Sequence, residues 1–149
     1  MYYKHIMQAA FNVAKLSDDP TAQVGCAICD QDGNLLSVGF NKLKSHIDKS
    51  NIDIILNNKN IKNYAFEHAE MVALSKLEKT DKILDMYITH PSCLNCVVNF
   101  ALNSDFKFKT IYYVSQGSEN FKIRYKVEEA LSLLELKGIL AIPHKITSI

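Results

Sequence analysis

The sequence has very little net charge, only one arginine and no long hydrophobic run. Its 17 basic and 16 acidic residues leave a formal charge of +1 at pH 7. Such a balance gives no long-range attraction to nucleic acid or to an acidic membrane surface. Apart from Arg124 the basic residues are all lysine, and they form no dense patch of the kind that binds RNA. Nucleic acid is therefore not an expected partner.

Patterns that target or anchor a chain are also missing. No apolar run approaches the roughly 20 residues that a membrane-spanning helix needs. The first residues carry charges at amphipathic spacing in place of the apolar centre of a signal peptide. The chain has four cysteines, and two of them stand in a pattern suited to a metal, which fits a reducing compartment. We expect a cytoplasmic protein with no membrane partner.

Chain length limits the number of domains. With 149 residues, of which 48% are hydrophobic, the chain can bury one substantial core but is too short for two ordinary domains. We predict a single domain that covers residues 1–149.

The most specific pattern is an H-A-E triplet followed further along the chain by P-S-C-L-N-C. One histidine and two cysteines, His68, Cys93 and Cys96, supply the nitrogen and sulfur ligands that zinc prefers. Three protein ligands leave the fourth tetrahedral position open for water, as in catalytic zinc sites. The sequence therefore predicts a Zn²⁺ site.

Both halves of this site are expected at helix N-termini. Three-residue spacing puts Cys93 and Cys96 on one face of a helix, and Ser92 is a suitable N-cap for it. The unpaired N–H groups and the dipole of a first helical turn favour thiolates. His68 is expected to open a second helix, so that two helix N-termini meet at one metal.

Glu70 is the carboxylate that remains once the three ligands are assigned. Zinc makes a bound water more acidic, and a neighbouring carboxylate can take its proton and deliver it elsewhere. We therefore expect Glu70 to be catalytic. Weaker interpretations exist for the separate parts, because C-x-x-C also occurs in structural zinc sites and redox motifs and a single histidine is often an ordinary core or surface residue.

The other cysteine pair, Cys26 and Cys29, lies in an apolar run that is expected to be a strand. Three-residue spacing in a strand points the two thiols to opposite faces of the sheet. We expect both to be buried and unreactive.

Hydrophobic periodicity predicts alternating helices and strands. The expected elements are a helix to about Leu16, strands 24–29 and 35–40 joined by a turn at Asp32 and Gly33, a helix from His68, a strand 84–89, a helix from Cys93 to near Asn103, a strand 110–114, a helix that ends at Gly138, and a strand 139–142. Strands joined by a helical crossover are parallel and right-handed. The pattern predicts the α/β class, with a three-layer α/β/α fold on a mixed five-stranded sheet.

Residues 42–66 form a divergent insertion between the second strand and the first zinc helix. Ile52 to Leu56 are expected to form a short helix or a lid. A solvated insertion is one interpretation. The other is a positively charged rim that receives a phosphate through Lys42 or Lys44, and the sequence leaves both open.

These motifs resemble the zinc-dependent cytidine and deoxycytidylate deaminase superfamily. Residues 67–96 carry its H-x-E and C-x-x-C signature. S-D-D-P-T-A-Q-V-G at 17–25 and G-F-N at 39–41 are most similar to the deoxycytidylate (dCMP) deaminase branch. The resemblance extends to about Pro143, apart from the divergent insertion, and implies the same α/β/α fold with Zn²⁺ as cofactor.

The resemblance also implies roles for individual residues. Asn41 would contact the sugar of a nucleotide, the N–H of Ala69 would hold the base carbonyl, and the carbonyl of Ser92 would accept from the reacting amine. Glu70 would pass a proton to N3 of the base and then to the departing amine. His90 is expected to be no more than a pocket-wall residue. The implied reaction is the hydrolytic deamination of a cytosine nucleotide, with dCMP giving dUMP and ammonia.

The chain departs from its relatives at several positions. It has P-S-C where many have P-C, and Val72 where the dCMP branch usually has asparagine, a pattern nearer to the tRNA adenosine deaminases. G-F-N-K-L replaces the G-Y-N-G-x-P that is associated with allosteric nucleotide binding, which leaves feedback control open. A tRNA adenosine deaminase, a free cytidine deaminase and a non-catalytic structural zinc domain are the alternatives. Relatives are usually hexamers or dimers, so the resemblance implies a homo-oligomer.

Overall fold

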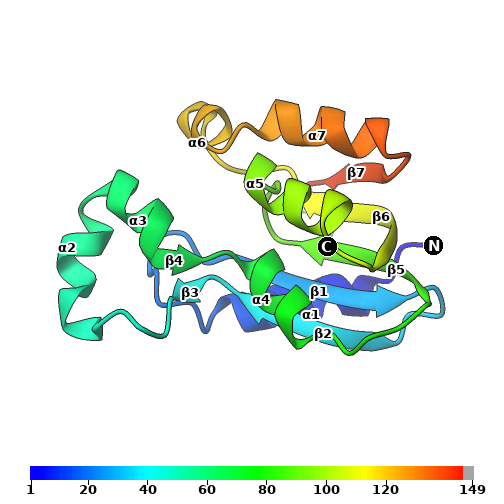
Figure 1. Cartoon of the computed structure of the whole chain (residues 1–149), viewed down its shortest axis with the longest axis horizontal. Coiled ribbons are helices and arrows are strands. Elements are labelled where there is room, and N and C mark those ends of the chain that lie inside the picture. Colours follow the sequence, from blue (N-terminus) through cyan, green and yellow to red (C-terminus); the bar gives the residue numbers. More distant parts are fainter. Residues whose placement is uncertain (146–149) are drawn as a thin grey trace.

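The structure, a computed structural model, describes residues 1–145 of the predicted domain 1–149 (Figure 1). At its centre is a five-stranded sheet with the order β2-β1-β5-β6-β7. β1 pairs antiparallel with β2 and β5, whereas β5, β6 and β7 run parallel. The strands are β1 (Gly25–Asp30), β2 (Leu35–Phe40), β5 (Ile83–Ile88), β6 (Lys107–Val114) and β7 (Leu140–His144). The predicted mixed five-stranded sheet is confirmed.

Helices cover both faces of this sheet and give three layers (Figure 1). On one face α1 (Lys4–Ala14) buries Ile6 and Met7 completely against the sheet, in a core that includes Tyr87. A second, larger core on the other face includes Phe100 and Leu134. The helices of that face are α4 (Ala69–Lys76), α5 (Leu94–Val97) and α7 (Val127–Leu136). The predicted α/β/α fold is confirmed.

Several element bounds differ from the predicted ones. α1 ends at Ala14, where its buried stripe ends, and the side chain of Leu16 beyond it is 64% exposed. β6 begins at Lys107, earlier than predicted, because its first residues pair with the start of β5. β7 continues through Pro143 to His144. Within residues 1–145 no helix is both long and apolar enough to cross a membrane.

Cys26 and Cys29 lie on opposite faces of β1, as predicted. Cys26 belongs to the core under α4, α5 and α7, and Cys29 belongs to the core under α1. Both side chains are fully buried. Burial raises the pKa of the Cys29 thiol to about 12 and that of Cys26 well above its ordinary value. Both thiols therefore stay protonated at neutral pH.

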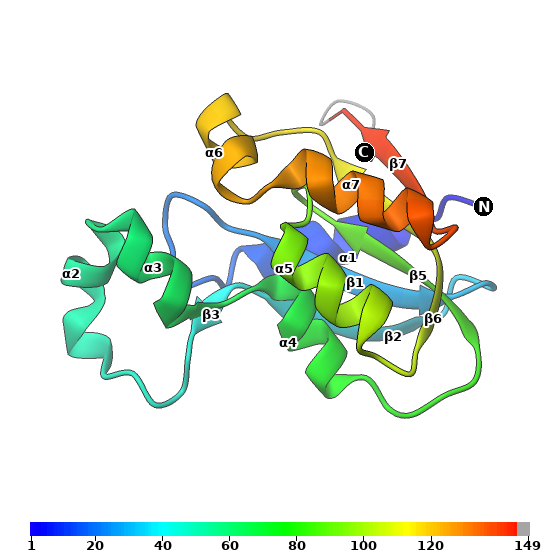
Figure 2. The same ribbon diagram turned by 45° about the horizontal axis from the view of Figure 1, so that its top comes forward.

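The insertion at residues 42–66 projects beside the sheet (Figures 1 and 2). The predicted short helix is confirmed as α2, and a second helix, α3, follows it with Asn58 as its N-cap. Leu43, Ile55, Ala65 and Phe66 form a small core of their own. The insertion is therefore ordered by local apolar packing. Its elements are β3 (Lys42–Leu43), η1 (Lys49–Asn51), α2 (Ile52–Leu56), α3 (Lys59–Ala65) and β4 (Phe66–Glu67).

Two helical segments after β5 differ from the prediction. α5 continues as a π-helical turn, η2 (Val98–Leu102), before the chain reaches Asn103. α6 (Glu119–Arg124) was not predicted, because Gly117 and Ser118 suggest only a break. Ser118 in fact caps α6, since its Oγ accepts a hydrogen bond from the N–H of Phe121 at 3.1 Å.

Candidate metal centre and active site

The three predicted ligands come together at one point. His68 and Cys93 are the N-cap residues of α4 and α5, and both have an extended backbone. Nδ1 of His68 lies 3.3 Å from Sγ of Cys93 and 3.2 Å from Sγ of Cys96. The two sulfur atoms are 3.2 Å apart. Two helix N-termini therefore meet at these ligands, as predicted.

This triangle of atoms fits a zinc ion. One ion can reach all three atoms with bonds of about 2.0–2.3 Å, and an imidazole with two thiolates is a donor set that zinc prefers. Among residues 1–145, no other group of three or more His, Cys, Asp or Glu side chains lies close enough together to share one ion.

The two ligand thiols differ in acidity. Hydrogen bonding from Cys96, reinforced by His68, lowers the pKa of Cys93 to about 4 although burial opposes it. The hydrogen bond that Cys96 donates to Cys93, together with burial, raises the pKa of Cys96. Cys93 is therefore a thiolate at neutral pH and ready to bind a cation.

Ser92 is not the N-cap of α5, so this prediction was wrong. The cap is Cys93, whose Sγ accepts a hydrogen bond from the N–H of Cys96 at 3.4 Å. The sulfur occupies the position at which a capping oxygen would accept. The Ser92 hydroxyl instead donates to Oε2 of Glu70 at 2.9 Å.

A close approach of β2 to α4 positions His68 and Glu70. A Cβ atom at Gly39 would lie 2.4 Å from the nitrogen of Ala73 and 2.5 Å from the oxygen of Ala69. The hydroxyl of Ser37 donates to the carbonyl of Ala73 at 2.6 Å. Only glycine allows this contact, which fixes the first turns of α4 against the sheet.

Glu70 is a buried carboxylate beside the ligand set. Its side chain is on the second residue of α4, and the residue is 4% exposed. Burial, together with the negative charge of Cys93, raises the pKa of Glu70 above its ordinary value. A carboxylate in such surroundings is suited to accept and return protons.

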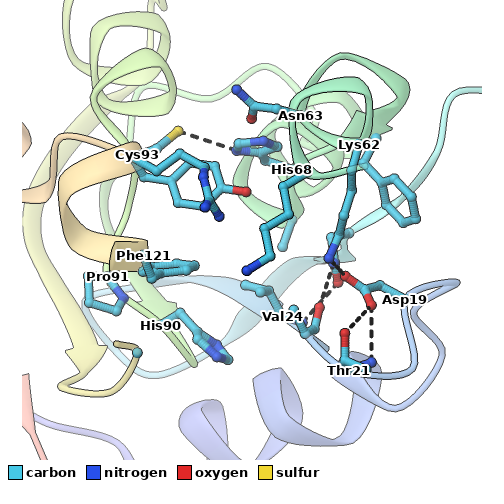
Figure 3. A pocket seen from close by; sticks show the side chains of 18 of the residues that line it. Asp19, Thr21, Val24, Lys62, Asn63, His68, His90, Pro91, Cys93 and Phe121 are labelled. Carbon is cyan, nitrogen blue, oxygen red and sulfur yellow. Dashed lines mark hydrogen bonds and ion pairs between the residues drawn. The ribbon is translucent and has the colours of Figure 1, made fainter. Parts of the chain in front are cut away.

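A pocket of about 370 Å³ opens beside the ligands (Figure 3). His68 and Cys93 lie at one side of it, Phe121 forms another part of the wall, and Asp19 and Lys62 lie across the cavity from Cys93. The volume is within the range of sites that take small ligands, about 300–1,000 Å³.

The predicted substrate contacts are only partly gathered in this pocket. Asn41, Ala69 and Glu70 line it, whereas Ser92 does not. The amide of Asn41 is engaged with the backbone: Oδ1 accepts from the N–H of Val24 at 2.9 Å, and Nδ2 donates to the carbonyl of Ala22 at 2.7 Å. A contact between Asn41 and a sugar therefore stays a prediction, as do the roles of Ala69 and Ser92.

The basic residues of the pocket are not the ones expected. Lys42 and Lys44 do not line it, and Lys44 lines an adjoining cavity that His68 also lines. The cations of the pocket are Lys59 and Lys62 from α3 and Arg124 from α6. The insertion thus contributes charge through its second helix, and not through its first residues.

The aromatic wall at α6 was not predicted. Phe121 and Tyr125 have ring centroids 4.7 Å apart, and Tyr125 lies 5.9 Å from the ring of His68. His90 lines the pocket, as expected, with its ring 6.0 Å from Phe121. The capping serine before Phe121 is the local signal from which α6 can be recognised.

The fold is shared with several solved structures. The dCMP deaminase from the cyanophage S-TIM5 in complex with dCMP and dUMP has a TM-score of 0.70 and 20% identity, over 97% of this chain and 100% of that one. The apo form of that enzyme has a TM-score of 0.68 and 20% identity, over 95% of each chain. RibD from Acinetobacter baumannii has a TM-score of 0.62 and 20% identity, over 93% of this chain and 34% of that one. At this identity the likeness concerns the fold, and no curated protein sequence matches the chain.

The sequence profile of the cytidine and deoxycytidylate deaminase zinc-binding region matches residues 2–114. This range covers most of the 149 residues and includes His68, Glu70, Cys93 and Cys96. The profile describes a zinc-binding region, in agreement with the ligand triangle. The chain belongs to the zinc-binding family of cytidine and deoxycytidylate deaminases.

Proposed function

We propose that this protein catalyses the hydrolytic deamination of dCMP to dUMP and ammonia. The observation that carries the proposal is the position of Glu70, a buried carboxylate beside the zinc ligands and on the wall of the pocket. The likeness of residues 17–25 to the dCMP branch supports this substrate. So does the shared fold with the cyanophage dCMP deaminase, which was solved with dCMP and dUMP.

The chain's own residues can perform the proton transfers of this reaction. Zinc, when bound to His68, Cys93 and Cys96, supplies Lewis acidity that makes water a better nucleophile. Glu70 takes one proton from the attacking water and delivers it to N3 of the cytosine ring. It then takes the second proton from the hydroxyl newly attached to C4 and gives it to the departing amine, so that ammonia leaves and the C4 carbonyl forms. The N–H of Ala69 would hold the base carbonyl.

The cations of the pocket support a substrate that carries a phosphate. Within residues 1–145, no carboxylate lies within ion-pair distance of Lys59 or Arg124, whereas Lys62 pairs with Asp19. An arginine offers two parallel hydrogen bonds to a phosphate, and a lysine offers a point charge. We expect the phosphate of dCMP to contact Arg124 and Lys59.

Three other functions compete with this one. A tRNA adenosine deaminase would need a broad basic surface, and the near-neutral charge of the chain gives no support for one. A cytidine deaminase would have no use for Lys59 and Arg124 as phosphate contacts. A structural zinc domain would leave the buried carboxylate of Glu70 without a role.

The direct test is ammonia release by the zinc-loaded protein with dCMP, dCTP, deoxycytidine and CMP, each with and without dTTP or dCTP as an effector. We expect dCMP to be the preferred substrate. Preference for deoxycytidine would favour the nucleoside enzyme. Activity on none of the four would contradict the proposal, and salt-sensitive tRNA binding would then point to a nucleic-acid substrate.

Replacing Glu70 tests the proton-transfer role. Glu70→Gln keeps the size of the side chain but removes the carboxylate, so we expect zinc content to stay the same and kcat to fall by at least about 100-fold. Glu78→Gln, at an exposed position beyond α4, is the matched control and should keep full activity. Near-normal kcat in the Glu70 variant would show that another group moves the proton.

A further inference from the structure

The hydroxyl of Ser92 makes one contact that the proposed reaction does not yet use. Ser92 lies in the loop between β5 and α5, and its Oγ donates to Oε2 of Glu70 at 2.9 Å. Ser92 is 8% exposed and Glu70 is 4% exposed. A hydrogen bond to an ionised acceptor that is shielded from water is among the stronger ones in proteins.

The hydroxyl of Ser92 has no helix-capping role. The cap of α5 is Cys93, whose sulfur accepts the hydrogen bond from the N–H of Cys96. The thiol of Cys96 also faces Glu70. A cysteine that binds a metal does so as a thiolate and has no proton to donate. Beside the backbone N–H of Glu70 itself, the hydroxyl of Ser92 is therefore the side-chain donor that stays available to the carboxylate when zinc is bound.

We propose that Ser92 is a positioning residue that holds one oxygen of the Glu70 carboxylate and so fixes the direction of the other. With Oε2 held by Ser92, rotation about the last side-chain bond is restricted, and Oε1 is left to exchange protons with the substrate. A catalytic group that is fixed in its productive orientation lowers the barrier of the chemical step more than it strengthens substrate binding. This inference rests on the proposed function.

The test compares Ser92→Ala with Ser92→Thr. The alanine variant removes the donor with little change in volume, and we expect kcat for dCMP to fall about tenfold while KM changes less than twofold. The threonine variant keeps a hydroxyl and should recover most of the lost kcat. Zinc content should be the same in both variants and in the wild type.

Ser37 provides the matched control. Its hydroxyl is also buried and also anchors α4, but through the carbonyl of Ala73 instead of Glu70. Ser37→Ala loosens α4 as a whole, so we expect it to lower Tm and to lower kcat much less than Ser92→Ala does. Equal losses of kcat in the Ser37 and Ser92 variants, unchanged kcat in Ser92→Ala, or no recovery in Ser92→Thr would each overturn the positioning role.

A readout without turnover separates this inference from the proposed function. In protein with ¹³C-labelled glutamate carboxylates, Ser92→Ala should shift one carboxylate stretching band in the infrared spectrum. The same substitution in the Glu70→Gln background should shift none. If Ser92→Ala has the same carboxylate bands as the wild type, the contact between Ser92 and Glu70 is overturned. A band shift in a protein that releases no ammonia from any cytosine nucleotide would confirm the contact. The same result would overturn the proposed reaction and, with it, the positioning role of Ser92 in catalysis.

Discussion

Arg124 is the side chain on which recognition of the phosphate is expected to depend. It extends from α6 into the pocket and, within residues 1–145, has no carboxylate at ion-pair distance. Arg124→Gln should raise KM for dCMP about tenfold, since a hydrogen-bonded charge pair contributes about 1.5 kcal/mol or more. Activity on deoxycytidine, which has no phosphate, should not change.

The control for this variant lies on the same helix. Lys122 pairs with Glu119 at 3.8 Å and does not line the pocket. Lys122→Gln should leave KM for dCMP unchanged. A similar rise in KM for both variants would mean that the general charge of α6 attracts the substrate and that Arg124 makes no specific contact.

His90 should make the fold sensitive to acid. Burial lowers its pKa to about 4, whereas an unfolded histidine has a pKa of about 6.5. Between these values the unfolded chain binds more protons, so the free energy of unfolding falls as the pH drops from about 6.5 to about 4. The difference corresponds to about 3 kcal/mol.

Chemical denaturation at pH 7 and pH 4.5 checks this expectation. His90→Gln cannot take up a proton at this position, so it should lose less stability than the wild type over that interval. Protonation of the zinc ligands affects both proteins alike and cancels in the comparison. An equal loss in both proteins would show that His90 remains accessible to water.

At this scale the metal ligands could be predicted, because their spacing places them at the first turns of two helices. The contact between Ser92 and Glu70 could not be predicted. Ser92 is free to make it only because Cys93 is the cap of α5, and that depends on where the sulfur of a metal ligand lies. Lys42 and Lys44 were the wrong lysines for the pocket. Which of the many lysines in the insertion faces the site depends on how α3 packs, and periodicity does not show that.

Among the elements, β2 and α4 form the contact on which the site geometry depends most. Gly39→Ala would place a methyl group 2.4 Å from the nitrogen of Ala73, so α4 has to move away from the sheet. Overpacking of this kind costs about 1–3 kcal/mol. His68 moves with the start of α4, so zinc affinity should fall along with Tm.

Gly138→Ala is the control for a general loss of stability. Gly138 has a φ of +73° but has open space around the position of a Cβ atom. The substitution should lower Tm through backbone strain and leave zinc affinity unchanged. If both variants bind zinc like the wild type, α4 can shift without moving His68.

The insertion is held to the rest of the fold by an ion pair. Lys62 on α3 pairs with the buried side chain of Asp19, which also accepts from the N–H and hydroxyl of Thr21 at 3.0 Å each. Burial would raise the pKa of Asp19, but the bonds from Lys62 and Thr21 outweigh it and lower the pKa. The S-D-D-P segment thus fixes α3 beside the pocket.

For the whole molecule, zinc should act as a cross-link between two helix units. His68 and Cys93 come from separate helices, and a metal that binds only the folded chain stabilises it by mass action. With free zinc at about 100 times its dissociation constant the gain is about 2.7 kcal/mol. For a chain of this size that raises Tm by roughly 5–10 °C.

Thermal unfolding with and without a chelator measures this gain. Cys93→Ser should abolish most of the difference between the two conditions. Cys29→Ala, which removes a buried thiol from the opposite face of β1, should retain it. A zinc-dependent shift that survives in the Cys93 variant would place the metal elsewhere.

The pocket is lined by residues from two different parts of the chain, which explains why the reaction class could be predicted more readily than the substrate. The family profile covers residues 2–114 and includes all three ligands. Phe121, Arg124 and Tyr125 follow after this range and still line the pocket. The residues that would contact a substrate beyond its reacting ring thus come from a segment whose position depends on long-range packing of α6 and α7.

Pro143 has a consequence for how copies of the chain can associate. The N–H of Ser115 donates to the carbonyl of His144 at 2.7 Å, so His144 faces β6 and the neighbouring residue on β7 faces outward. That neighbour is Pro143, which has no N–H to offer at the open edge of the sheet. A strand from a second copy would find a gap in the row of donors there. Any homo-oligomer of this protein is therefore not expected to assemble by extending its sheet past β7.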